Sequence, residues 1–180
     1  YANYVRQSNR SNQGLADPEI FARTVLWQSD LEVLSIQPLI KFKSHFTKDG
    51  NPRSGSRSND VELSILYGRK PDILSPNDYY EMRAAYRYRT NGLNDQWRTD
   101  ASLGLEVVPN FYVIPAFRTI IATKLDANAT FSENADQDYD LMKAELGLAY
   151  RYSPTDAVGL TAFKHVMGFQ TGNGMGIIAS

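Results

Sequence analysis

Apolar and charged side chains alternate with a period of two residues along most of this chain. The segment 80–90, "YEMRAAYRYRT", shows the pattern. Every second position from Tyr80 to Tyr88 holds a tyrosine, a methionine or an alanine, and the positions between them include Glu81, Arg83 and Arg87, with Arg89 next in that series. Successive side chains of a β-strand point to opposite faces of a sheet. The alternation therefore predicts a strand with one apolar face and one charged face.

This period recurs from end to end, whereas the helical spacing of three to four residues does not. The sequence predicts about ten strands and no helix, in one all-β domain over residues 1–180. The stronger segments are Leu31–Phe46, Asp60–Gly68, Asp78–Thr90, Gln96–Val107, Phe111–Leu125, Tyr139–Tyr152 and Ala157–Met167. The weaker segments are Ala2–Gln7, Glu19–Gln28 and Met175–Ala179.

The links between these segments fall into two length classes. Short links follow the strands that end near Gln28, Val107 and Tyr152, and a medium link runs from Arg69 to Asn77. Longer polar links occupy Ser8–Pro18, Thr47–Asn59 and Asp126–Asp138, and Asn91-Gly92 is a hairpin signal. Short turns on one rim and long loops on the other are typical of an antiparallel up-and-down transmembrane β-barrel. Several segments are also longer than the roughly 9 to 11 residues that a tilted strand needs to cross the hydrocarbon layer.

We expect the charged face to line the lumen of such a barrel. The predicted lumen residues are Lys41, Lys43, Arg83, Arg87, Arg89, Arg98, Asp100, Glu106, Arg118, Lys124, Lys143, Glu145 and Arg151. With Glu32, Glu62 and Glu81 included, this face holds ten bases and six acids, an excess of four bases that favours anions. The alternative is that these groups pair with one another and plug the barrel, as in small barrels with filled interiors.

Aromatic residues gather beside the short and medium turns. Assigned to the periplasmic rim, they predict one interfacial aromatic girdle: Trp27, Tyr79, Tyr80, Phe111, Tyr112, Tyr150 and Tyr152. Candidates at the opposite rim are Phe46, Tyr86, Tyr88, Trp97, Phe131 and Tyr139. A soluble β-sandwich is the competing interpretation, because it shows the same alternation with its charges in water.

Other classes of protein receive little support. The chain has no cysteine, and its two histidines, His45 and His165, stand in no pattern typical of a catalytic triad or a metal site, so we expect no enzyme activity, metal or other cofactor. The net charge of −1 does not favour binding to nucleic acid. No apolar run is long enough for a membrane-spanning helix, which needs roughly 18 residues or more.

Several segments resemble a known group of proteins. "GLADPEIFARTVLW", "VLSIQPLIKF", "NDVELSILYGR", "EMRAAYRYRTNGLNDQWRTDASLGLEVVP" and "AELGLAYRYSP" are similar to uncharacterised proteobacterial outer-membrane β-barrel proteins. These are related to the outer-membrane transporter family associated with phenol degradation. The resemblance covers Gly14 to Ala179 and implies an export signal, an outer-membrane location in a Gram-negative bacterium and about a dozen strands.

Two departures from this group concern the ends of the chain. Its members have further strands before the "GLADPEI" segment and finish on an aromatic residue, whereas this chain ends in "GMGIIAS". We therefore expect the sequence to be an excerpt, trimmed at both ends, of a longer barrel protein.

The sequence thus favours a porin-like passive channel for small polar or anionic solutes. The expected partners are outer-membrane lipid, a small anionic solute and other envelope proteins. One alternative is a non-conducting barrel that acts as a structural anchor or as a subunit of an envelope complex. Another is a soluble lipocalin-like binding protein, which requires the apolar face to point inward.

Overall fold

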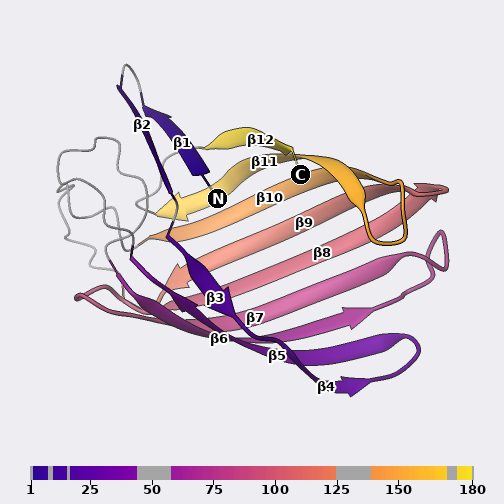
Figure 1. Ribbon diagram of the computed structural model, residues 1–180, viewed down its shortest axis with the longest axis horizontal. Helices are drawn as coiled ribbons and strands as arrows, with labels where there is room; N and C mark the ends of the chain where they lie inside the picture. Colours follow the sequence, from indigo (N-terminus) through magenta and orange to yellow (C-terminus); the bar gives the residue numbers. More distant parts are fainter. Residues whose placement is uncertain are drawn as a thin grey trace.

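The computed structural model describes residues 2–7, 10–15, 17–43, 58–124, 139–169 and 174–179, with the backbone alone for residues 2–15. Every regular element in these residues is a β-strand (Figure 1). The strands are β1 (Ala2–Gln7), β2 (Arg10–Leu15), β3 (Glu19–Phe21), β4 (Thr24–Gln28), β5 (Glu32–Lys41), β6 (Asp60–Arg69), β7 (Tyr79–Arg89), β8 (Gln96–Val108), β9 (Phe111–Ala122), β10 (Asp140–Arg151), β11 (Ala157–Phe169) and β12 (Met175–Ala179).

Ten of these strands form one antiparallel sheet. From β5 to β12 each strand pairs with its neighbours in the sequence, and β3 and β4 both pair with β5. This up-and-down order confirms the predicted all-β antiparallel topology. Within the described residues the sheet is not closed, so that β12 forms one edge and β3 with β4 forms the other.

A hairpin of β1 and β2 stands apart from this sheet. Ala2 pairs with Leu15, and the register continues to the pair Gln7 and Arg10. The prediction of a polar link over Ser8–Pro18 was therefore wrong for Arg10–Leu15. The hydrogen bonds of an antiparallel pair join backbone groups, and every residue except proline has the N–H that they need. A polar segment can therefore form one strand of a hairpin.

The predicted strand Glu19–Gln28 is interrupted at Ala22 and Arg23, and Pro38 in the neighbouring strand gives the reason. The N–H of Ala22 donates to the carbonyl of Pro38 at 3.2 Å. An antiparallel pair at this point needs a second bond, from the N–H of residue 38, and proline has none. The ladder therefore stops here, and it resumes where Thr24 pairs with Ile36.

The connections sort by end of the sheet only in part: the two longest lie at one end as predicted, but the links after β7 and β11 at that same end are shorter than the link after β6 at the other. One end carries the links after β4, β6, β8 and β10, and the link after β8 is the tight turn Pro109-Asn110. The other end carries the links after β5, β7, β9 and β11, and those after β5 and β9 are the longest in this sheet. We call these the short-link end and the long-link end.

Several strands between them are shorter than predicted, and those from β5 to β11 span 10 to 13 residues.

Burial is inverted relative to a soluble sheet. In β6 the charged Glu62 is only 1% exposed, whereas Val61 and Leu63 on either side of it are 52% and 53% exposed. The same contrast holds in β7, where Arg87 is buried and Tyr86 and Tyr88 are exposed. The polar face is thus the enclosed one.

Curvature of the sheet explains how a single layer can enclose side chains. The guanidinium of Arg87 in β7 lies 3.4 Å from a carboxylate oxygen of Glu19 in β3, although β5 and β6 separate these strands in the sheet. Three strand spacings amount to roughly 14 Å along a flat sheet, which is too far for these two side chains to bridge. The sheet is therefore concave on its polar face.

None of the described residues forms a helix that is long and apolar enough to cross a membrane.

Candidate functional site

Most of the predicted lumen residues share the concave face. Cross-strand registers join them directly, for example Arg83 to Asp100 and Asp100 to Arg118. The predicted residues on this face are Lys41, Arg83, Arg87, Arg89, Arg98, Asp100, Glu106, Arg118, Lys143, Glu145 and Arg151.

Three charged residues differ from the prediction. Lys43 and Lys124 lie beyond the ends of β5 and β9 and are exposed, so neither belongs to a strand face. Glu32 lies on the outer face, where it accepts a hydrogen bond from the Tyr67 hydroxyl at 2.9 Å and contacts Arg69 at 3.4 Å. Strand parity agrees with this outer position, because Glu32 shares its parity with Leu34 and Ile36 and not with Lys41.

Glu62 is the centre of an ion-pair network on the concave face. Its carboxylate contacts Arg87 at 2.6 Å and Arg98 at 3.1 Å, and it also accepts a hydrogen bond from Arg83. Arg83 contacts Asp100 at 3.3 Å as well. Charge-assisted hydrogen bonds of this kind are about twice as strong as neutral ones. Three neighbouring strands, β6, β7 and β8, are thereby joined through one carboxylate.

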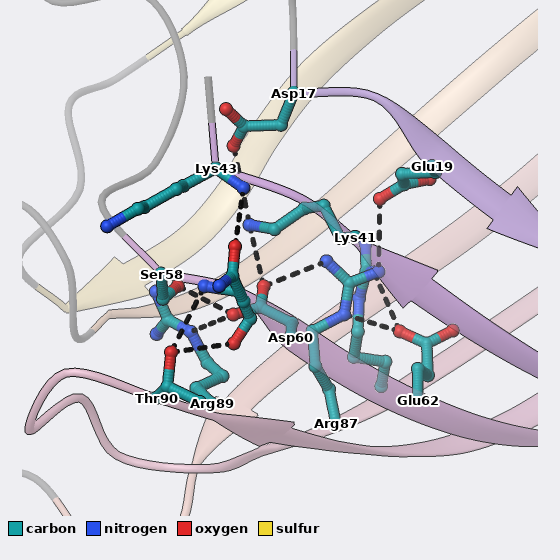
Figure 2. Close-up of polar contacts among 12 residues, drawn as sticks. Asp17, Glu19, Lys41, Lys43, Ser58, Asp60, Glu62, Arg87, Arg89 and Thr90 are labelled. Atoms are coloured by element: carbon teal, nitrogen blue, oxygen red, sulfur yellow. Dashed lines mark hydrogen bonds and ion pairs between the residues drawn. The ribbon is translucent and has the colours of Figure 1, made fainter. Parts of the chain in front are cut away.

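Asp60 holds the long-link end of the same network (Figure 2). Its carboxylate lies 2.6 Å from the Lys41 ammonium, 3.5 Å from Arg87 and 3.9 Å from Arg89, and it accepts a hydrogen bond from the Ser58 hydroxyl at 2.6 Å. Asp60 is absent from the predicted lumen residues. Its position indicated this face nonetheless, because Asp60 has the same strand parity as Glu62.

These findings reduce the predicted excess of basic residues on this face. Lys43 and Lys124 leave the set of bases, Glu32 leaves the set of acids, and Asp60 joins the acids. For the predicted residues together with Asp60, the excess falls from four to two. Most of the arginines are also engaged by carboxylates, as the alternative of a paired interior predicts.

A second, more open cluster lies across β9 and β10. The Glu145 carboxylate contacts Arg118 at 2.9 Å and Lys143 at 2.6 Å. The Lys143 ammonium also lies 5.2 Å from the centre of the Phe163 ring, within the range of a cation–π contact. The side chain of Arg118 is 48% exposed, so this cluster remains accessible to solvent or solute.

Of the two histidines, the structure describes only His165. His165 lies beside Phe163 on the concave face, with ring centres 6.0 Å apart, and its Nδ1 accepts a hydrogen bond from the Gly174 N–H. His45 falls outside the described residues. No group of three or more potential metal ligands occurs in the described part of the chain.

The predicted aromatic girdle divides between the two faces. Tyr79 and Tyr112 lie on the concave face with ring centres 6.2 Å apart, so their assignment to a lipid-facing girdle was wrong. Tyr79 stands directly opposite Gly104, and its ring covers the space that a side chain at 104 would fill. Tyr112 accepts a hydrogen bond from Arg151 and also has that guanidinium 4.9 Å above its ring. The five remaining members lie on the outer face: Trp27, Tyr80, Phe111, Tyr150 and Tyr152.

At the long-link end, Tyr86 and Trp97 form an exposed outer pair. Their ring centres are 4.9 Å apart at an edge-to-face angle of 65°. The Tyr86 hydroxyl donates to Asp95 in the adjacent link at 2.6 Å. An amphipathic ring with its hydroxyl toward a polar loop is typical of a membrane interface. Phe46 and Phe131 lie outside the described residues.

The link between β6 and β7 is fixed by a buried carboxylate. Asp78 Oδ2 accepts hydrogen bonds from the N–H groups of Ile73, Leu74 and Ser75, and its Oδ1 accepts one from Glu106 at 2.8 Å. Burial by itself raises the pKa of Asp78, but these four donors outweigh that effect and hold the pKa below its usual value. Asp78 therefore ties the short-link end of β8 to this turn.

Comparison with known proteins adds no assignment, since no protein-family model, no curated protein and no solved structure matches the chain. The function is therefore inferred from the chemistry of the concave face. This face presents guanidinium, ammonium and carboxylate groups on a concave surface, of which the Arg118 side chain is about half exposed.

Proposed function

We propose that this protein is an outer-membrane β-barrel, related to proteobacterial barrels of the phenol-degradation transporter group, that acts as a passive channel for small polar and anionic solutes. The concave face is the lumen and the outer face contacts lipid. No catalytic step is part of this proposal. The observation that carries it is the inverted burial of the two faces.

The outer face supports a lipid environment. Large apolar side chains on it are about half exposed in every strand from β5 to β11, and no second layer of structure covers them in the described part of the chain. Soluble monomers rarely expose contiguous apolar patches above a few hundred Å². A soluble lipocalin-like binder would turn these side chains inward, so the inverted burial favours the membrane over that alternative.

The hydrogen-bond pattern of the strands fits the same environment. In hydrocarbon, every backbone N–H and C=O needs an internal partner, and the inner strands from β5 to β11 supply such partners to one another, while β12 and β3 with β4 form the edges of the described sheet. The strands from β7 to β10 span 11 to 13 residues. That length suffices to cross the hydrocarbon layer at a tilt.

Arg118 is the residue through which the channel is best tested. It lies on the concave face, half exposed, and contacts the carboxylate of Glu145. We expect Arg118→Glu to lower the preference for anions in a planar bilayer, because it replaces an accessible positive charge with a negative one. Substitution of Arg87 would be less informative, because Arg87 is buried and a glutamate there would face the buried Glu62 and Asp60, whereas at the half-exposed position 118 solvent screens the repulsion from Glu145.

The control for this experiment is Arg69→Glu. Arg69 is exposed to a similar degree as Arg118 but lies on the outer face near the short-link end. The reversal potential in a salt gradient should shift for Arg118→Glu and stay unchanged for Arg69→Glu. Equal shifts, or none, would contradict a lumen on the concave face.

A non-conducting barrel is the second candidate, and the Glu62 network favours it. Side chains from three strands meet there, and most of each is enclosed. Such a network can fill a small barrel. A protein that needs detergent for extraction from membranes but gives no conductance in bilayers would identify this alternative.

A further inference from the structure

A cavity of about 250 Å³ opens on the concave face beside the Glu62 network. Its floor includes three small residues, Gly68, Ser102 and Ala116, which stand in one cross-strand row with Glu81: Gly68 pairs with Glu81, Glu81 with Ser102, and Ser102 with Ala116. Longer side chains would fill this row. The cavity is therefore a direct consequence of the sequence at these positions.

Two of the charged pairs beside the cavity are satisfied within the protein. Arg83 contacts Asp100 at 3.3 Å, and Arg118 contacts Glu145 at 2.9 Å. Arg83, Asp100 and Arg118 line the cavity, but their charges are already balanced. They are therefore poor binding partners for a charged solute, because each already has an opposite charge beside it in the protein.

Arg23 and Glu81 also line the cavity, and they differ from those pairs. Arg23 donates from Nε to the Gln37 side-chain oxygen at 3.0 Å, a neutral partner. Among the described residues, no carboxylate contacts Arg23 and no base contacts Glu81. One cation and one anion of the same cavity thus remain available.

The position of Arg23 has a local cause. The strand ladder breaks opposite Pro38, which lacks an N–H, and Arg23 lies in this break between β3 and β4. Gln37, the residue that receives its hydrogen bond, is buried on the concave face. The break therefore brings a basic side chain from the edge strand to the cavity.

We propose that this cavity binds a small zwitterionic solute of the α-amino acid class. The guanidinium of Arg23 receives the carboxylate, which it can hold in bidentate fashion. The carboxylate of Glu81 receives the ammonium group, and the small residues Ser102 and Ala116 beside Glu81 leave room for a small side chain. The inference rests on the proposed function, because it names the solute class of that channel.

The test uses alanine as the probe and lactamide as its neutral analogue of similar size. We expect saturable binding of alanine to the detergent-solubilised full chain by calorimetry, and no binding of lactamide. Arg23→Gln and Glu81→Gln should each weaken alanine binding by about tenfold or more, since each leaves one charge of the ligand without a partner. The control Lys70→Gln changes an exposed base outside the cavity and should leave binding unchanged.

Equal heats for alanine and lactamide, or alanine binding that both variants retain, would overturn the inference. Swelling of liposomes that contain the protein separates this result from the proposed function. If both solutes enter the liposomes at the same rate and calorimetry shows no alanine binding, the zwitterion site is overturned while the proposed channel function stands. If both variants weaken alanine binding but the liposomes swell in neither solute, the result supports the binding site and contradicts the channel.

Discussion

Glu62 is the residue on which the order of the concave face depends most. Its fully enclosed carboxylate balances Arg83, Arg87 and Arg98. Glu62→Gln removes that charge and leaves the arginines without their shared partner. Loss of one partner from a buried pair costs about 3–5 kcal/mol, so we expect a clear fall in the urea midpoint of unfolding from detergent micelles.

The control for Glu62→Gln is Glu81→Gln on the same face. Glu81 is exposed and has no ion pair in the described part of the structure, so its substitution should change the free energy of unfolding by less than about 0.5 kcal/mol. Equal midpoints for the two variants would show that the Glu62 network contributes nothing to stability.

Asp78 gives the fold a dependence on pH that can be measured. Its pKa is lowered in the folded state by the N–H donors of the β6–β7 link, against about 3.9 in an unfolded chain. The ionised carboxylate therefore stabilises the fold above that value, and the contribution declines as pH falls through the lower folded pKa. We expect Asp78→Asn to unfold at a lower denaturant concentration than the wild type at neutral pH.

The same comparison at acid pH completes the prediction for Asp78. The difference between wild type and Asp78→Asn should shrink as the pH falls below about 4, because the wild-type carboxyl then becomes neutral as well. A difference that is constant from neutral to acid pH would contradict the role of the charge.

The pairing of β7 with β8 depends on a glycine beneath an aromatic ring. A Cβ at Gly104 would overlap the ring of Tyr79 on the opposite strand. Gly104→Ala should therefore cost about 1–3 kcal/mol through overpacking. At Gly147, where a Cβ would meet Ile114 and Thr161 at 3.3 Å, alanine should cost less.

A double-mutant cycle separates this contact from the general loss of a glycine. In a Tyr79→Ala background, Gly104→Ala should lose most of its cost, because the ring that it displaces is gone. Thermal unfolding of the wild type, both single variants and the double variant measures this coupling. Additive costs would contradict the proposed packing of Tyr79 over Gly104.

At the scale of the elements, the period of two was sufficient to predict most strands. It identified β5 to β12 within a few residues, and it assigned the concave face correctly for the residues in the middle of strands. Two residues at strand ends were misassigned or missed although their parity was informative, because Glu32 shares parity with the outward Leu34 and Asp60 shares parity with the inward Glu62. The period of two also missed β2, whose pairing depends on backbone bonds and not on apolar residues.

Two features of the site were not predictable from alternation alone. The ion pairs of Glu62 join residues on three strands, and their partners depend on the register, which one sequence does not define. The prediction of lipid contact for Tyr79 and Tyr112 rested on their position beside turns, whereas strand parity places Tyr79 with Glu81 in β7 and Tyr112 with Arg118 in β9. Parity was the better guide to facing.

The whole molecule is dominated by a curved sheet that encloses its charges and exposes its apolar side chains. Charges on the concave face are stabilised by pairing, so that they need no bulk water around each group. Exposure of the apolar outer face to water is unfavourable, and we propose that membrane lipid covers it. The proposed function therefore depends on which of the two faces meets hydrocarbon.

Spin labels at two adjacent residues of β7 can distinguish the two faces in a membrane. Because the chain has no cysteine, Glu81→Cys and Met82→Cys each give a single labelling site. Both side chains are exposed, Glu81 on the concave face and Met82 on the outer face. In lipid vesicles we expect the label at 82 to collide mainly with dissolved oxygen, which concentrates in hydrocarbon, and the label at 81 mainly with a water-soluble nickel complex. Preference for the nickel complex at 82, or the same preference at both positions, would contradict a lipid-facing outer surface.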